Sequence, residues 1–131
     1  MRKLLTVLLL NIIGISGYTQ TIEYKSKYAT ISESTQSQLT NTEVLDIETS
    51  LTFNYKDSLI ILKTANKKSV YWMQRYYEGV KEYIDATDSN NNEYTFSFLY
   101  NKYGVIDVLI LEDKKNKTIV TDFHIYETVM K

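Results

Sequence analysis

The chain has 131 residues, with 15 Lys and Arg, 16 Asp and Glu, one His, and neither Cys nor Pro. This length accommodates a single domain. The lack of Cys excludes disulfide frameworks, thiolate zinc sites and cysteine nucleophiles, and a single His argues against a multi-histidine metal centre. The nearly balanced charge provides no basic face for phosphates, so we expect no nucleic-acid partner. No Gly-rich phosphate loop is present, and we expect no cofactor.

The first 20 residues have the three parts of a secretory signal peptide. Arg2 and Lys3 form a positive start, residues 4–15 form an apolar stretch, and residues 16–20 are more polar. The apolar stretch is shorter than the ~20 residues that a membrane-spanning helix needs. We therefore predict a signal peptide over residues 1–20 and a single domain over residues 21–131. The mature protein is expected in the periplasm, on the outer surface or outside the cell, with no stable membrane insertion after cleavage.

Apolar and polar residues alternate with a period of two through most of the chain, which is typical of half-buried strands. The clearest case is residues 44–55, where Leu45, Ile47, Leu51 and Phe53 share one face. The other predicted strands are residues 21–32, 59–62, 94–100, 105–111 and 118–128, with two more inside 69–84. Eight strands joined by short turns predict an all-β antiparallel meander, as a small barrel or a strongly curved sheet or sandwich.

Residues 69–84 fit two interpretations. Their β-branched and aromatic residues, with Gly79 in the middle, favour two strands that meet at Glu78 and Gly79. Apolar residues at helical spacing favour a helix instead, which would make the fold α+β. We prefer two strands. The helical spacing is carried by Val70, Met73, Tyr77, Val80 and Ile84.

Other segments predict a loop, a turn and two strands that are covered on both faces. Residues 32–42 are rich in Ser, Thr and Gln and predict a mobile loop. Gly104 suits the left-handed position of a short hairpin. The runs 59–62 and 105–111 are apolar on both faces, so we expect a sandwich, a barrel with a covered outer face, or a dimer.

Aromatic residues are the most unusual feature of the composition, with 12 Tyr, 4 Phe and one Trp. Amphipathic rings suit binding surfaces because they bury a large area while the hydroxyl stays hydrated. On regular strands Trp72 and Tyr76 would share one face, and Tyr71 and Tyr77 the other. The alternative is ordinary cross-strand packing. The predicted ligand-binding residues are Tyr71, Trp72, Tyr76, Tyr77 and Tyr83.

Two polar features are candidates for chemistry. Asp122 and His124 are two residues apart on a predicted strand, with Tyr126 next on the same face, so the first two could form an acid–base pair. The alternative is a solvated strand face. Asp107 interrupts the apolar run 105–111, and a carboxyl group buried there would have a raised pKa. The alternatives are a partly solvated position or a Lys or Arg partner.

The segment 88–92 begins like a calcium loop, with Asp, Asn and Asn at alternate positions. Glu93 then occupies the position of the required Gly, and Leu99 occupies the position of the final Glu. The pattern therefore predicts a polar hairpin turn and no metal site.

Taken together, these features predict a small exported, non-catalytic β-domain that binds a small apolar ligand, a glycan or a protein partner. One alternative is a structural or interaction subunit of an extracytoplasmic assembly, including a homo-oligomer, with an exposed apolar patch larger than ~300–600 Å². Another is a small hydrolase that uses Asp122 and His124. A ligand barrel would hold a dry cavity between two predicted faces, which consist of Leu45, Ile47, Leu51 and Phe53 on one side and Tyr94, Phe96 and Phe98 on the other.

Overall fold

The computed structural model describes residues 21–35, 38–115 and 119–130, so the predicted signal peptide lies outside the described residues. The described chain forms one antiparallel sheet, and within it there is no helix long and apolar enough to cross a membrane. The all-β prediction is confirmed. The strands are β1 (Thr21–Thr35), β2 (Gln38–Leu45), β3 (Thr49–Asn54), β4 (Leu59–Lys63), β5 (Lys68–Tyr77), β6 (Glu82–Thr87), β7 (Glu93–Tyr100), β8 (Ile106–Asp113) and β9 (Ile119–Met130).

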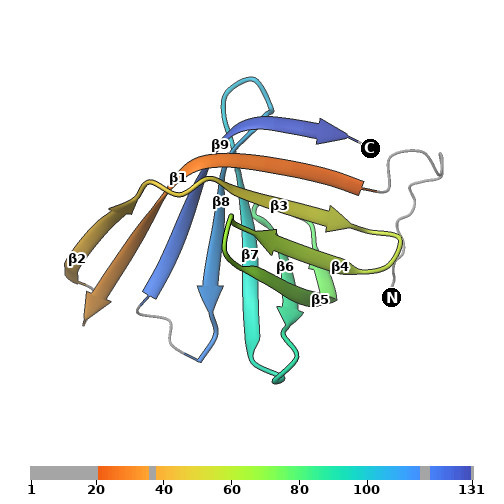
Figure 1. Ribbon diagram of the computed structural model, residues 1–131, viewed down its shortest axis with the longest axis horizontal. Helices are drawn as coiled ribbons and strands as arrows, with labels where there is room; N and C mark the ends of the chain where they lie inside the picture. The colour runs from red at the N-terminus through yellow and green to blue at the C-terminus, as the bar shows by residue number, and fades with distance from the viewer. Residues whose placement is uncertain (1–20, 36–37, 116–118, 131) are drawn as a thin grey trace.

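The sheet closes because β9 pairs with β1 along nearly the whole length of both strands, from Ile22 opposite Met130 to Glu33 opposite Ile119. β1 and β3 to β9 thus form an eight-stranded barrel, and β2 lies beside β1 as an additional strand (Figure 1). The predicted small barrel is confirmed. An eight-stranded barrel is just wide enough for its own side chains to fill the interior.

Strand β1 contacts two different neighbours on one of its edges. Its first part, Thr21–Ser26, pairs with β3, and its second part, Ala29–Thr35, pairs with β2. The register between β1 and β9 shifts twice, leaving Lys27 and Tyr126 without a residue opposite them. Such bulges bend strands and increase their twist. Accordingly, β3 and β4 run across the view in Figure 1 while β7 and β8 run down it.

Aromatic side chains fill the middle of the barrel. Phe53 and Phe96 expose no surface, and their rings meet edge to face with centroids 5.9 Å apart. The centroids of Tyr24 and Phe98 each lie 5.5 Å from that of Phe53. The buried apolar residues are Tyr24, Ala29, Leu51, Phe53, Ile60, Tyr71, Ile84, Ala86, Phe96, Phe98, Leu109 and Phe123.

The two faces that were predicted to border a cavity instead meet each other at this level of the barrel. Leu51 and Phe53 from one face are buried with Phe96 and Phe98 from the other. Ile47 takes no part, because the chain leaves the sheet before it and 44% of its surface is exposed. The predicted pattern therefore identified the core of the fold.

Two predicted boundaries are wrong around β2. The expected loop over 32–42 is largely strand, because β1 continues to Thr35 and β2 begins at Gln38. Polar residues such as Ser32 and Thr42 pair across this hairpin, and a strand beyond the barrel core does not require an apolar face. The expected single strand over 44–55 is divided at residues 46–48. Before this break the chain pairs with the second half of β1, and after it the chain pairs with the first half. The sheet thus has nine strands rather than eight.

The preferred interpretation of residues 69–84 is confirmed, and the helical alternative is wrong. β5 and β6 pair antiparallel across residues 78–81. The register shifts once in β5, leaving Gln74 without a partner, so the inward residues Tyr71, Met73 and Tyr76 are spaced by two and then by three. Of the five residues at helical spacing, only Met73 and Ile84 lie on the inward face, and Val80 is fully exposed in the turn. The predicted Gly104 turn is also present, with a left-handed φ of 79°.

The two runs that are apolar on both faces lie in β4 and β8. Ile60 and Leu109 are fully buried inside the barrel, whereas Ile61 and Ile110 are half-buried on its outer wall. A closed barrel with a covered outer face was one of the three expected arrangements, and the closed barrel is present. In the single chain, the outer apolar residues of these two strands keep part of their surface exposed to solvent.

Candidate functional site

Four tyrosines and one glutamate gather at the end of the barrel that carries the β3–β4, β5–β6 and β7–β8 turns. The Glu82 carboxylate accepts hydrogen bonds from the hydroxyl groups of Tyr76 and Tyr100. Tyr24, near the start of β1, and Tyr55, directly after β3, lie at the same end of the barrel, and burial, with a smaller contribution from the charge of Glu82, raises the pKa of both. We refer to these five residues as the tyrosine mouth.

A shift in strand register aims one of these side chains, Tyr76, inward. Because Gln74 is an extra residue in β5, Tyr76 lies opposite Ile84, whose side chain is fully buried. Tyr100 needs no such shift, because it follows Phe96 and Phe98 in regular alternation along β7; the shift between β7 and β8 leaves Asp107 of β8 unpaired and sets Ile106 opposite Tyr100. Bulges commonly occur near barrel rims, where they redirect a side chain.

The tyrosine mouth is partly open to solvent. Tyr76 exposes 41% of its surface and Tyr100 exposes 50%, whereas Tyr24 exposes 4%. Tyr55 exposes 36% of its surface, yet burial raises the pKa of its hydroxyl strongly. Its hydroxyl therefore lies inside, and its exposed part is the remainder of the residue. Tyr55, Tyr76 and Tyr100 therefore keep part of their surface open to solvent, while Glu82 holds the hydroxyls of Tyr76 and Tyr100.

The electrostatics of the mouth keep the tyrosines protonated. Burial is the largest cause of the raised pKa of Tyr24, Tyr76 and Tyr100, and the charge of Glu82 adds to it. Glu78 on the β5–β6 turn raises the pKa of Tyr76 and Tyr100 further. At neutral pH these hydroxyls are therefore hydrogen-bond donors, and the Glu82 carboxylate is the acceptor that Tyr76 and Tyr100 share.

A second candidate site lies at the opposite end of the barrel, between the β4–β5 and β6–β7 turns. It is a hollow of 280 Å³ with mainly polar side chains. We refer to it as the polar hollow. Its lining residues are Lys67, Lys68, Ser69, Val70, Tyr71, Asp88, Ser89 and Tyr94.

Asp88 organises the turn beside the polar hollow. One carboxylate oxygen accepts hydrogen bonds from the backbone amides of Asn90 and Asn92, each at 2.9 Å. The other accepts from the Asn92 side chain at 3.1 Å and from the Tyr94 hydroxyl at 3.2 Å. Burial alone would raise the pKa of Asp88, but these hydrogen bonds lower it below its ordinary value. The carboxylate is thus committed to holding the predicted polar turn.

The five aromatic residues predicted as one ligand surface occupy three different places. Tyr71 is buried in the core, and Tyr76 belongs to the tyrosine mouth. Trp72 is 41% exposed on the outer wall. Tyr77 and Tyr83 also lie on the outer wall, where they stack against each other with centroids 4.4 Å apart. Only Tyr71 and Tyr76 therefore belong to either candidate site.

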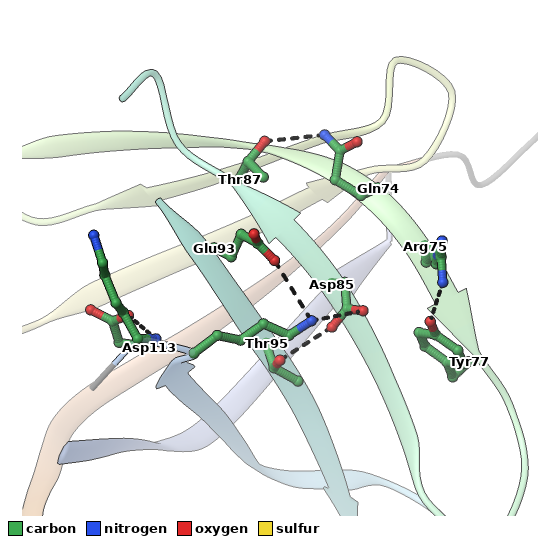
Figure 2. Close-up of polar contacts among 10 residues, drawn as sticks. Gln74, Arg75, Tyr77, Asp85, Thr87, Glu93, Thr95 and Asp113 are labelled. Atoms are coloured by element: carbon green, nitrogen blue, oxygen red, sulfur yellow. Dashed lines mark hydrogen bonds and ion pairs between the residues drawn. The ribbon is translucent and has the colours of Figure 1, made fainter. Parts of the chain in front are cut away.

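The prediction that Trp72 and Tyr76 share a face is wrong, because the extra residue Gln74 lies between them and changes the alternation of the strand. Tyr77 lies on the outer side of β5, where its hydroxyl accepts a hydrogen bond from Arg75 at 3.2 Å (Figure 2). This bond raises the pKa of the Arg75 guanidinium.

Asp107 does not occupy a buried position, so the buried-acid interpretation is wrong. Its side chain is exposed. The pairing of β7 with β8 shifts at this residue, and Asp107 is the one left without a partner. The bulge therefore lets a charged residue remain in solvent inside an otherwise apolar run.

Asp122 and His124 lie on the outer wall of β9, as their spacing predicted. The His124 ring stacks on Tyr28 with centroids 4.5 Å apart, and its Nε2 atom lies 3.1 Å from the Thr30 hydroxyl. In the described part of the chain, no hydrogen bond or ion pair joins the ring to Asp122. Burial raises the pKa of Asp122, and the nearby His124 opposes that rise. An acid–base role for the pair stays a prediction.

Tyr126, the third residue of this predicted polar set, is 51% exposed because it lies at the β9 bulge. The Lys27 ammonium, from the bulge in β1, lies 4.9 Å from the centroid of its ring. These two unpaired residues therefore contact each other rather than His124.

A polar network on the outside of β6, β7 and β8 has a structural role. The Lys114 ammonium lies 3.2 Å from Asp85 and 4.0 Å from Glu93, and the Thr95 hydroxyl donates to Asp85 at 3.2 Å (Figure 2). Partly exposed ion pairs of this kind contribute about 0–1 kcal/mol each. Each partner is satisfied within the network.

No family, curated protein or solved structure matches this chain. Within residues 21–35, 38–115 and 119–130, no three His, Asp or Glu side chains are grouped to hold a metal ion. Function must therefore be argued from the side chains of the two candidate sites.

Sequence reasoning missed most of the tyrosine mouth, although a signal was present. Tyr55 and Tyr100 each end a row of alternating apolar residues, and the period of two puts them on the same face as that row. Glu82 continues the inward row of Ile84 and Ala86. What identifies the site is that these polar residues lie at the same end of their strands. That relation becomes visible only when the order of the strands is known.

Proposed function

We propose that this chain is an exported, non-catalytic binding domain that holds a small ligand at the tyrosine mouth. One observation carries the proposal: four tyrosines from four separate parts of the chain gather with Glu82 at one end of the barrel, where Tyr76 and Tyr100 donate to its carboxylate and Tyr55, Tyr76 and Tyr100 are partly exposed. Tyrosine is enriched at binding surfaces because it presents a large rigid area and a hydroxyl with few rotatable bonds.

The fixed geometry of the mouth supports a binding role. Because Glu82 holds the hydroxyls of Tyr76 and Tyr100, both rings are oriented before any ligand arrives. A preorganised site loses less conformational entropy on binding than a mobile one. The remaining exposed ring surface can then contribute to affinity.

The packing of the core supports a ligand at the end of the barrel rather than one enclosed in its middle. The Phe53 ring contacts those of Phe96 and Phe98 in the interior, and each of the three exposes 3% of its surface or less. An apolar ligand at this level would have to displace these rings.

The chemistry of the mouth supports binding over catalysis. General acids and bases work best with pKa values near the operating pH. The tyrosine hydroxyls have pKa values raised above an already high ordinary value, with burial as the largest cause. They are therefore poor proton donors to a reaction and poor nucleophiles at neutral pH.

The proposal is tested by mapping small probes on the folded protein by NMR. The probes are choline, methyl glucoside and hexanoate, which are cationic, neutral and anionic. At least one should cause saturable shifts of the backbone amides of residues 78–82 and 99–105. Tyr76→Ala should abolish them, whereas Trp72→Ala, which removes an exposed ring from the outer wall, should not. Shifts confined to residues 67–69 and 88–92 would move the site to the polar hollow, and no saturable shifts would reject the binding role.

A further inference from the structure

The charge of Glu82 has only neutral partners among the residues that the structure describes. Its two carboxylate oxygens accept from the Tyr76 and Tyr100 hydroxyls. The ion pairs of the described chain lie elsewhere, and join Lys25 to Glu127 and Lys114 to both Asp85 and Glu93. A half-buried charge costs free energy unless it is both hydrogen-bonded and paired, and the two hydroxyls give Glu82 hydrogen bonds without an opposite charge. A cation is therefore the missing electrostatic complement.

The aromatic rings around Glu82 also favour a positively charged ligand. The face of an aromatic ring carries partial negative charge and attracts ammonium groups within about 6 Å of its centre. Tyr55, Tyr76 and Tyr100 are all partly exposed at this end of the barrel, and the hydroxyls of Tyr76 and Tyr100 contact the carboxylate. The same end of the barrel already shows one such contact, because the Lys102 ammonium lies 5.2 Å from the centroid of the Tyr103 ring.

The turns that border the mouth supply apolar surface. Val80 on the β5–β6 turn is fully exposed. Tyr103 and Val105, on the β7–β8 connection, expose 77% and 52% of their surfaces. A ligand with a charged head at Glu82 could bury its apolar part against these residues. Glu78, on the same turn as Val80, raises the pKa of Tyr76 and Tyr100 and would repel an anion.

We propose that the tyrosine mouth binds an organic ammonium ion, whose positive head contacts Glu82 and whose alkyl groups pack on the tyrosine rings. This inference rests on the proposed function, because it names the ligand class of the same site. Neutral sugars and carboxylates are the classes that it excludes.

The test compares choline with 3,3-dimethylbutan-1-ol, which has the same shape but a carbon in place of the charged nitrogen. Dissociation constants are measured for both probes by NMR titration of the amides of residues 78–82. Choline should bind about tenfold more tightly than the neutral alcohol, because only choline gains the ion pair and cation–π contacts. The comparison uses the unaltered protein, so it does not depend on the stability of a variant.

A pair of charge-removing variants locates the effect. Glu82→Gln keeps the shape of the side chain and should weaken choline binding about tenfold while leaving the alcohol unchanged. Glu43→Gln removes a charge from the exposed strand β2 and should change neither. Circular dichroism of both variants verifies that the fold is retained.

The outcomes separate this inference from the proposed function. Equal affinity for choline and the alcohol, or choline binding that is indifferent to Glu82→Gln, overturns the ammonium inference but leaves a ligand site at the mouth. Binding there of methyl glucoside or hexanoate, without choline, does the same. If none of these probes shifts the amides of the mouth, both the inference and the proposed function fail.

Discussion

The Tyr100 hydroxyl donates a hydrogen bond to the Glu82 carboxylate, which Tyr76 also contacts from the opposite neighbouring strand. Glu82 lies on β6, between β5 and β7, so this single carboxylate joins three consecutive strands at their ends. The arrangement stabilises the rim of the barrel and fixes the rings that we assign to ligand binding. Stability and binding at this end are therefore linked through one residue.

Removing one hydroxyl from this cluster should lower stability without unfolding the protein. Tyr100→Phe deletes a donor to a partly exposed carboxylate, which we expect to reduce the free energy of unfolding by about 0.5–1.5 kcal/mol. Tyr76→Phe should behave similarly. Because the two residues share Glu82, the double variant should deviate from the sum of the single effects. Urea denaturation measures all three changes.

The control for these variants is Tyr126→Phe, which removes a hydroxyl from the exposed outer wall. It should change the free energy of unfolding by less than about 0.5 kcal/mol. If Tyr100→Phe is equally neutral, the hydrogen bond to Glu82 does not stabilise the rim.

The free energy of unfolding should fall as the pH rises above about 10, because tyrosines are buried in the folded state. Burial, with the charge of Glu82, raises the pKa of Tyr24 above its ordinary value of about 10, so the folded state keeps a proton that the unfolded state loses. The stabilisation is complete below pH about 10 and is lost as pH rises from there toward the folded-state pKa. Tyr55 and Tyr76 act in the same direction.

The measurement is the free energy of unfolding by urea from pH about 8 to 11, together with the ultraviolet absorbance of tyrosinate. For Tyr24 alone, the free energy of unfolding should fall by about 1.4 kcal/mol per pH unit at most. Tyr100 is exposed and should contribute less, because solvent screens its interactions. Tyr24→Phe should flatten the curve. A curve that Tyr24→Phe leaves unchanged would contradict the assignment of burial to this hydroxyl.

The β6–β7 turn should depend on Asp88. Asp88→Ala removes four accepted hydrogen bonds and should lower the urea midpoint, whereas Asp88→Asn keeps one acceptor oxygen and should lower it less. Because these bonds lower the pKa of Asp88, its contribution is present above its unfolded pKa of about 4 and is lost as pH falls through the lower folded value. An unchanged midpoint in Asp88→Ala would show that the turn forms without it.

The sequence predicted the β-sheet because its core rows are regular. Leu51 and Phe53, and likewise Phe96 and Phe98, alternate with polar residues over a whole strand, and period two is the strongest local signal of a half-buried strand. The β1–β2 hairpin was missed because its residues are mainly polar. Its strands are held by pairing rather than by an apolar face.

The candidate site was harder to predict because bulges leave little trace in this sequence. Neither Gln74 nor Asp107 is a Gly or stands beside a Pro, which are the usual markers of a break in a strand. Bulges of this kind accompany the bending of strands in a closed barrel, a property of the whole sheet. Without them, Trp72 and Tyr76 appear to share a face, and Asp107 appears buried.

The bulge at Gln74 yields the sharpest test of this explanation. Residues before and after Gln74 already pair in regular alternation with β6, so its deletion should leave Tyr71 and Tyr76 facing inward. We expect a cost of about 1–2 kcal/mol, mainly from lost twist and from the hydrogen bond between Gln74 and Thr87. Urea denaturation gives the cost, and choline titration shows whether the mouth survives.

Deletion of Val70 is the matched control, because it removes a residue that does pair, with Ile61 on β4. It forces the rest of β5 to slip by one residue or to form a new bulge, and a slip turns each following side chain to the other face of the sheet. Tyr71 would then leave the core, and we expect a loss of more than about 3 kcal/mol or no folded protein. If deletion of Gln74 is equally damaging, the extra residue is required for the barrel to close, and Tyr76 faces inward for that reason rather than through the register alone.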